Sequence, residues 1–341
     1  MGLCYYFFKY PKMKSFWKFK IAQSLFSQKE IELENTKEIY KVLEFFVLFN
    51  NSRISKKEKN LLFFPGKLSQ KGKNIEVENI CDIVDILLLI GMFFEDDIDV
   101  EFTGITNDIH SVDIFKITHW KIFGLLKYKG FQLNIKKRGF PPIGKGIVHL
   151  HMKNIKNSND MFKKASDFEG YKKTYENFEF VRKQKIEKIR GLVISSRTGS
   201  ECTFQMIKAI KECFKKFKNT KVMSIINNKN DSGPSPGFEC SITAETKNGI
   251  FYVTKKGDSI ENASNIAKEC ANDLMNHIKD EYVYDEVLIN RILFYFTHGS
   301  SVGKLLCKKV DLDFIEFLKE ETHAQIDVAS FKNYFIVTVV K

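Results

Sequence analysis

Apolar residues recur along the chain at two different spacings, which predict helices that alternate with strands. Between residues 38 and 49 the positions Ile39, Val42 and Phe46 follow helical spacing. Helices are expected over residues 16–27, 38–49, 79–94, 111–128, 201–217, 259–279, 283–296 and 314–320. Strands are expected over residues 61–64, 98–102, 133–138, 147–152, 192–195, 221–227, 238–245, 250–254 and 334–340.

The order of these elements predicts an α+β fold of α/β layers, with helices on one face of each sheet. The helix at 79–94 should be buried, with Asp82 and Asp85 on its wetter side. Residues 153–185 are polar and lack a clear period, which favours a connecting segment with one or two exposed strands. A new α/β unit begins at Ile186, and the Asn248-Gly249 pair predicts a hairpin turn within it. No internal repeat is visible in the sequence.

The charge balance predicts a polyanionic partner. The 341 residues carry a formal net charge of +12, and 43% of them are hydrophobic, which is typical of a folded domain with a core. A protein this basic is predisposed to bind nucleic acid, because each neutralised phosphate releases counterions. The basic residues recur in four runs, namely Lys12/Lys14/Lys18/Lys20, Lys136/Lys137/Arg138, Arg182/Lys183/Lys185/Lys188/Arg190 and Lys215/Lys216/Lys218/Lys221.

Cysteine and histidine usage argues against a disulfide framework and against a bound metal. The seven cysteines are scattered and never spaced as CxxC, which favours a reducing compartment. His149 and His151 alternate on an expected strand, and the sequence places no acid to complete a metal shell. The acidic cluster at residues 95–99 is best interpreted as a solvated turn. Without a secretory signal, and with an apolar run of only 86–94, a soluble intracellular protein is expected.

Five short motifs follow one another over about 180 residues. They are LFFPG at residues 62–66, TGITND at 103–108 with SVD at 111–113, RGFPPIGKG at 138–146, KIRG at 188–191, and SGPSPGF at 232–238 with AET at 244–246. Glycine- and proline-rich loops bring backbone N–H groups and a cation to one place, which suits phosphate. In this order the motifs resemble the RNA 3′-terminal phosphate cyclase family, most closely the branch that builds ribosomes instead of cyclising RNA ends.

The resemblance implies a fold of repeated units with two helices on a four-stranded sheet. It also implies a large discontinuous domain at residues 1–186 and 283–341, interrupted by a smaller thioredoxin-like α/β insert at residues 187–282. The breaks in pattern at Ile186 and near Glu281 agree with this division.

Departures from the family pattern predict that the chain is not an enzyme. True cyclases are adenylated on a histidine, and the matching segment at residues 285–291 places Val287 there. Valine has no lone pair with which to attack a nucleotide phosphate, and His298 lies about three helical turns away. The glycine-rich turn that precedes the first helix in cyclases is replaced by residues 8–14. Ile143 and Lys145 replace two glycines of the Pro-Pro loop, and Glu239 replaces a glycine after the SPGF element.

The favoured interpretation is a non-catalytic ribosome-biogenesis factor of the nucleus and nucleolus, without a cofactor. The resemblance implies that it binds a ribosome-assembly GTPase and pre-rRNA within the small-subunit processome, where small-subunit pre-rRNA is cleaved. RNA or anion contacts are expected at Arg138, Lys145, Arg190, Ser235 and Gly237, although each of these residues could equally serve a structural turn. The alternatives left open are a pre-rRNA endonuclease, an active RNA 3′-phosphate cyclase, and a partner-binding module that never touches RNA.

Overall fold

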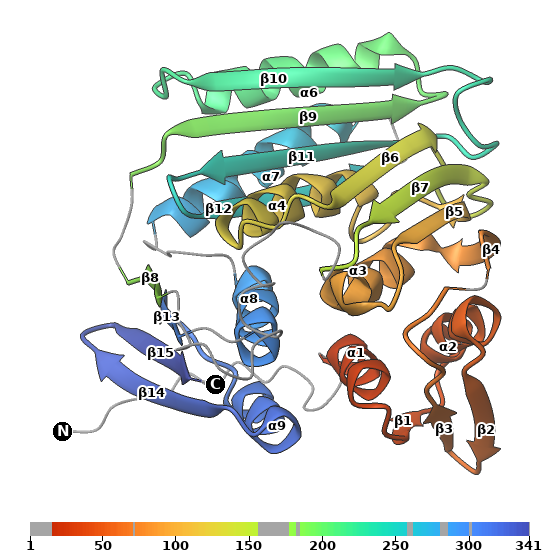
Figure 1. Ribbon diagram of the computed structural model, residues 1–341. Coiled ribbons are helices and arrows are strands. Elements are labelled where there is room, and N and C mark those ends of the chain that lie inside the picture. The colour runs from red at the N-terminus through yellow and green to blue at the C-terminus, as the bar shows by residue number, and fades with distance from the viewer. Residues whose placement is uncertain are drawn as a thin grey trace.

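The computed structural model describes residues 16–70, 72–155, 177–181, 185–257, 262–279, 286–299 and 302–340 (Figure 1). The stretch at residues 8–14, most of the expected connecting segment and the expected break near Glu281 lie outside these ranges. Within the described residues eight α-helices accompany four sheets, which confirms the predicted mixture of helices and strands. None of these helices combines the length and the hydropathy that a membrane-spanning helix requires.

Three units of two helices and one sheet build the large part of the molecule. The first has α1 (Trp17–Ser27) and α2 (Lys37–Asn50) with strands β1 (Ile31–Glu34), β3 (Asn60–Phe64) and β2 (Arg53–Lys57) in that order. The second has α3 (Ile80–Ile90) and α4 (Val112–Leu125) with strands β4 (Asn74–Asn79), β5 (Ile98–Ile105), β7 (Gly146–Met152) and β6 (Phe131–Lys137). The third has α8 (Glu286–His298) and α9 (Leu312–Thr322) with strands β14 (Gln325–Phe331), β15 (Tyr334–Val340), β13 (Val302–Cys307) and β8 (Asn177–Phe180).

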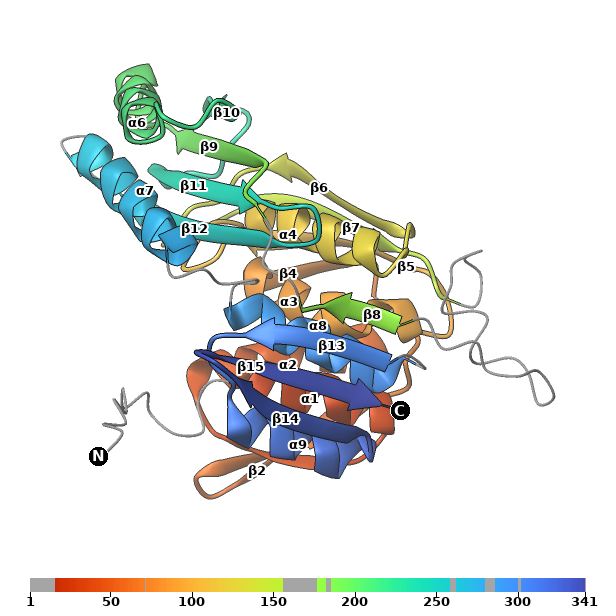
Figure 2. The ribbon, with the colours of Figure 1, turned by 90° about the vertical axis from the view of Figure 1, so that its left-hand side faces the viewer.

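The predicted repetition of units with two helices on one sheet is therefore visible in space, although not in the sequence. The sheet has the predicted four strands in the second and third units and three strands in the first. Figure 2 shows the third sheet with α8 and α9 behind it. Side chains of all three units form one continuous hydrophobic core, to which Phe46, Leu88, Leu293 and Val337 belong. Many of the 32 phenylalanines of the chain lie in this core. The rings of Phe45 and Phe49, for example, stack on each other with their centroids 4.9 Å apart.

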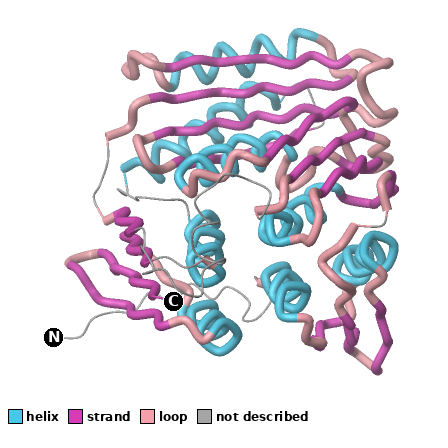
Figure 3. Tube along the Cα trace, in the orientation of Figure 1, coloured by secondary structure: helices cyan, strands magenta, loops and turns pink. Residues whose placement is uncertain are grey.

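The insert forms a fourth layer with its own core. Strands β10 (Thr220–Asn227), β9 (Lys188–Ser196), β11 (Gly237–Glu245) and β12 (Ile250–Gly257) form one sheet in that order. Helices α6 (Ser200–Cys213) and α7 (Ala263–Lys279) cover one face of it, as Figure 3 shows. A small cluster of Phe140, Leu192 and Ile194 on the other face meets the second unit. The separate cores fit two domains, while the boundaries at 186/187 and 282/283 stay a prediction.

Helix starts follow from local capping. The side chains of Thr36, Ser111 and Asp311 each accept a hydrogen bond from the backbone N–H three residues later. Helices α2, α4 and α9 therefore begin where a side-chain oxygen binds an N–H that has no partner within the helix. The apolar face of each helix then points into the core. One expectation about α3 is wrong: Asp85 is not on a wet face but buried, because a partner far along the chain neutralises it.

Candidate functional site

Two loops that carry distinctive motifs, at residues 138–146 and 231–237, are hydrogen-bonded to each other. The N–H of Gly233 donates to the Arg138 carbonyl at 2.6 Å, and the Arg138 N–H donates to the Asp231 carbonyl at 3.0 Å. The hydroxyl of Ser235 accepts from the Ile143 N–H at 3.1 Å. A Cβ at Gly233 would lie only 1.8 Å from a backbone oxygen of the facing loop, so glycine is required for this approach. The loops thus join the second unit to the insert.

Arg138 is held inside this junction. Its guanidinium forms a bidentate pair with Asp113, which lies in the first turn of α4; the Nη2–Oδ1 distance is 2.8 Å. Both side chains are buried. Burial alone would lower the pKa of Arg138, but the Asp113 carboxylate outweighs it and the pKa is raised. An external anion at Arg138 would therefore have to compete with Asp113, because the guanidinium is already bound to that internal carboxylate.

Glu239 fills the space beside this pair. Its carboxylate is fully buried and accepts hydrogen bonds from Asn107 Nδ2 at 2.7 Å, Ser111 Oγ at 2.8 Å and Ser241 Oγ at 2.6 Å. Burial and the neighbouring Asp113 raise the pKa of Glu239, although the three hydrogen bonds oppose that rise. Side-chain donors of the TGITND and SVD motifs thus bind an internal carboxylate that the sequence marks as a departure from the family pattern.

The other predicted contact residues are dispersed. Gly237 packs against the Phe140 ring, where a Cβ would approach to 2.5 Å. Arg190 on β9 pairs with Glu245 at 2.8 Å, and Lys145 pairs with Glu76 at 2.6 Å on the surface. Lys145 has φ +58°, a left-handed conformation that suits glycine better than lysine. The structure therefore brings Arg138, Ser235 and Gly237 together and leaves Lys145 and Arg190 elsewhere.

The position that matches the cyclase nucleophile opens helix α8. Val287 is the second residue of that helix, and Arg291 follows one turn later. Arg291 Nη2 lies 2.5 Å from Asp85 Oδ1, and Lys18 bridges Asp85 at 3.3 Å and Asp82 at 2.6 Å. Burial acts to raise the pKa of Asp85, but the two cations outweigh it and hold that pKa well below its usual range. This network of charges joins α1, α3 and α8.

His298 lies at the far end of the same helix, where it has a structural environment. Its ring stacks on Phe294 with centroids 4.1 Å apart, and Nε2 lies 2.7 Å from Gln23 Oε1. The sequence predicts that His298 lies away from the nucleophile position, and it is indeed the last residue of α8, eleven residues after Val287.

The acidic cluster at residues 95–99 lies on an exposed turn, and one expectation about its surroundings is wrong. Asp99 Oδ1 lies 2.8 Å from His149 Nε2 and 3.6 Å from His151 Nδ1, so an acid does stand beside both histidines. The sequence could not show this, because the contact depends on the register of β5 with β7. Even so, the described residues contain no cluster of three or more metal-capable side chains arranged to hold an ion.

A basic surface covers the outer side of the insert. It consists of six exposed lysines in the second half of α6, in the turn that follows it and at the start of β10. No ion pair is found for any of them among the described residues: Lys208, Lys211, Lys215, Lys216, Lys218 and Lys221. Phe204 is 66% exposed and Phe217 36% exposed in the same region. Cations interleaved with exposed aromatic rings suit the phosphates and bases of a single-stranded nucleic acid.

The insert also carries the clearest relationship to known proteins. Residues 181–279 match the family model described as the insert domain of RNA 3′-terminal phosphate cyclase. Together with the relatives below, this match confirms the resemblance to the RNA 3′-terminal phosphate cyclase family that the five motifs predicted.

The relatives that match this chain are named cyclase-like. The chain is 26% identical to the RNA 3′-terminal phosphate cyclase-like protein of Bos taurus over 253 residues, which cover 69% of this chain and 62% of that protein. The Homo sapiens protein of the same name is 26% identical over 267 residues, covering 71% and 66%. The probable cyclase-like protein of Arabidopsis thaliana is 30% identical over 171 residues, covering 48% and 41%. The chain thus spans a little less than two thirds of the length of these animal relatives.

Proposed function

We propose that this chain is a non-catalytic member of the RNA 3′-terminal phosphate cyclase family that acts in ribosome biogenesis. In this proposal it binds pre-rRNA and a ribosome-assembly GTPase within the small-subunit processome of the nucleolus, in the nucleus. The names of the relatives, which call them cyclase-like, support a role outside cyclisation. The net charge of +12 supports an RNA partner.

The observation that carries the proposal is Val287 at the start of α8, where the family resemblance expects the adenylated histidine. Covalent nucleotidyl transfer requires a nucleophile with an available lone pair, and an aliphatic side chain has none. The buried Glu239 carboxylate supports the same conclusion, because it binds nearby donors and adds negative charge that opposes a phosphate.

Incubation with ATP labelled at the α-phosphate should therefore leave the protein unlabelled. We expect no acid-stable or acid-labile protein–AMP adduct on a denaturing gel, and an active RNA 3′-phosphate cyclase provides the positive control. The Val287→His variant is also expected to stay unlabelled, because Glu239 still fills the junction. A covalent adduct on the unmodified chain would overturn the non-catalytic assignment.

RNA binding is expected to depend on the basic surface of the insert. Replacing Lys215, Lys216 and Lys218 by glutamate should weaken binding to a labelled pre-rRNA spacer fragment about tenfold or more, and reduce the salt dependence of binding. The measurement is fluorescence polarisation between 50 and 200 mM salt, a range in which phosphate contacts weaken steeply.

A charge-matched control separates local contact from net charge. Reversal of Lys304, Lys319 and Lys332 in the third unit changes the net charge by the same amount and should leave binding nearly unchanged. Equal weakening by both triple variants would show that the insert surface is not the RNA contact. Binding of the GTPase partner is tested separately, in a pull-down with the two purified proteins.

A further inference from the structure

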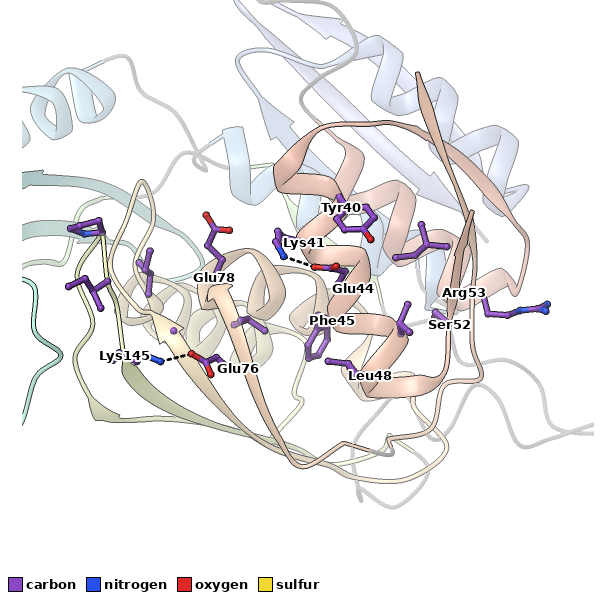
Figure 4. A pocket seen from close by; sticks show the side chains of 17 residues that line it. Tyr40, Lys41, Glu44, Phe45, Leu48, Ser52, Arg53, Glu76, Glu78 and Lys145 are labelled. Carbon is purple, nitrogen blue, oxygen red and sulfur yellow. Dashed lines mark hydrogen bonds and ion pairs between the residues drawn. The ribbon is translucent and has the colours of Figure 1, made fainter. Parts of the chain in front are cut away.

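A groove of about 950 Å³ lies between the first and second units (Figure 4). One face of α2 lines it, with Tyr40, Lys41, Glu44 and Leu48. Strand β4 borders it on one side and the start of β2 on the other, as Figure 4 shows. Both strands are the outermost members of their sheets. The groove is therefore bordered by two sheet edges. It shares Ile143 and Lys145 with the Pro-Pro loop described above, and the proposed RNA surface does not include it.

The β4 edge offers backbone groups to an additional strand. The Lys73 carbonyl accepts from the Glu101 N–H, so that Lys73, just before β4, directs its backbone toward β5. Because backbone groups of successive residues point to opposite edges of a strand, those of Asn74 and Glu76 are directed away from β5, ahead of a shift in register that follows Glu76. An extended peptide can pair with such an edge through its own main chain.

The helix face in this groove offers an apolar surface. Leu48 is 62% exposed and Val47 37% exposed, both on α2, while Ile143 from the Pro-Pro loop is 56% exposed at the other end. Apolar side chains that line a groove and stay open to solvent gain free energy when a partner covers them, at about 25 cal/mol per Å². This surface favours an occupant with apolar side chains on alternate positions.

The charges of the groove favour a peptide over a nucleic acid. Three carboxylates line it, and each is paired: Glu76 with Lys145 at 2.6 Å, Glu78 with Lys37 at 2.8 Å and Glu44 with Lys41 at 2.8 Å. Arg53 at the opposite border is exposed and lies over the Phe64 ring at 5.5 Å, with no carboxylate partner among the described residues. A phosphate backbone would meet the three carboxylates, whereas one acidic side chain could pair with the single remaining cation.

We infer that this groove docks an extended peptide segment of a protein partner. The segment adds a strand to the edge of β4, places alternate apolar side chains against Leu48 and Ile143, and directs an acidic residue to Arg53. This docking surface goes beyond the proposed function and stands or falls independently of RNA binding by the insert.

Selection from a random peptide library tests the inference directly. A library of 12-residue peptides displayed on phage is panned on the purified chain, and enriched sequences are synthesised with a fluorescent label. We expect apolar residues at alternate positions with a nearby aspartate or glutamate. Leu48→Asp should weaken peptide binding about tenfold or more, since it places a charge in the apolar contact. Leu312→Asp is the matched control, because Leu312 is also 62% exposed but lies on α9.

A proline variant tests strand addition itself. Glu76→Pro removes an outward N–H of β4 without removing a β4–β5 bond, and an edge strand tolerates proline. Binding should weaken about fivefold, the equivalent of one hydrogen bond, whereas Glu76→Ala should bind nearly normally. Circular dichroism checks that each variant is folded, and Leu48→Asp remains an independent test if the proline variant is not.

Several outcomes would overturn the inference. They are a library without enrichment over the uncoated surface, enriched peptides that bind Leu48→Asp as well as Leu312→Asp, or peptides unaffected by both Leu48→Asp and a folded Glu76→Pro. Loss of single-stranded RNA binding in Leu48→Asp, without any effect on peptides, would assign the groove to nucleic acid instead. None of these outcomes bears on the insert lysines, so the RNA proposal is judged separately.

Discussion

Replacing Arg291 by methionine is expected to lower the free energy of unfolding by about 3 kcal/mol or more. Methionine keeps much of the volume but leaves Asp85 buried with only Lys18 as counter-charge, at 3.3 Å. Removing one partner of a buried ion pair typically costs about 3–5 kcal/mol, because the remaining charge loses its compensation. Urea denaturation followed by tryptophan fluorescence and circular dichroism measures the change.

An exposed pair supplies the control for this experiment. Lys319 lies 2.9 Å from Glu316 on the surface of α9, and Lys319→Met should cost about 0.5 kcal/mol or less. If Arg291→Met were no more destabilising than Lys319→Met, the charges between α3 and α8 would not stabilise the fold.

The pH dependence separates the charge from the packing of Arg291. In the folded protein the pKa of Asp85 lies below its unfolded value, so the ion pair stabilises the fold at neutral pH. This contribution is lost as the pH falls below about 4, where the unfolded carboxyl binds a proton first. Arg291→Met removes the largest of the charge interactions that lower the pKa of Asp85, so the stability difference between the two proteins should shrink in acid.

Much of the fold was predictable because its helices and central strands carry strong periodic patterns. All eight helices of the described chain occur where apolar spacing predicts them. Four strands without a prediction lie at the edge of a sheet, namely β1, β2, β4 and β14, whereas a fifth, β13, is an inner strand. Strand β2, with the sequence RISKK, has four exposed residues of five, so it shows no alternation for the sequence to reveal. The peptide groove could not be predicted for the same reason, since two of these strands border it.

The candidate site was predictable in its motifs but not in its contacts. The sequence identified Glu239 as a departure, yet its donors Asn107 and Ser111 lie about 130 residues away along the chain. Arg291 and Asp85 are 206 residues apart. Long-range ion pairs leave no local signature, and a charged residue at helical spacing is more often solvated. The sequence therefore placed Asp85 on the wrong face and could not decide between a ligand contact and a structural turn at Arg138.

These contacts share one physical consequence. Around the junction of the second unit with the insert, the polar groups of Asn107, Ser111 and Arg138 bind internal carboxylates. Groups that are already paired in a buried site gain little from an external phosphate, because the internal pair must first be broken. A group of exposed lysines still open to a polyanion lies along α6, the turn after it and the start of β10, which is why the RNA experiment is directed there.

The buried pair at this junction provides the second large effect, expected in the Asp113→Asn variant. Asparagine keeps the shape of the side chain but removes the charge that neutralises Arg138, whose side chain is 6% exposed. We expect a loss of about 3 kcal/mol in the free energy of unfolding, somewhat less if the nearby Glu239 compensates in part. Hydrogen exchange should rise at residues 138–146 and 231–237, because backbone bonds of Arg138 link these two loops.

Glu245→Gln is the matched control for this variant. It neutralises the carboxylate of the other arginine pair, in which the Arg190 side chain is 40% exposed. A pair open to water is worth about 1 kcal/mol or less, so this variant should unfold nearly as the unmodified chain does. The structural role of Arg138 would be contradicted if Asp113→Asn left stability and loop exchange unchanged but weakened RNA binding. In that case the guanidinium would bind a phosphate of the RNA. Of the two roles that the sequence left open for Arg138, a ligand contact and a structural turn, the ligand contact would then be the correct one.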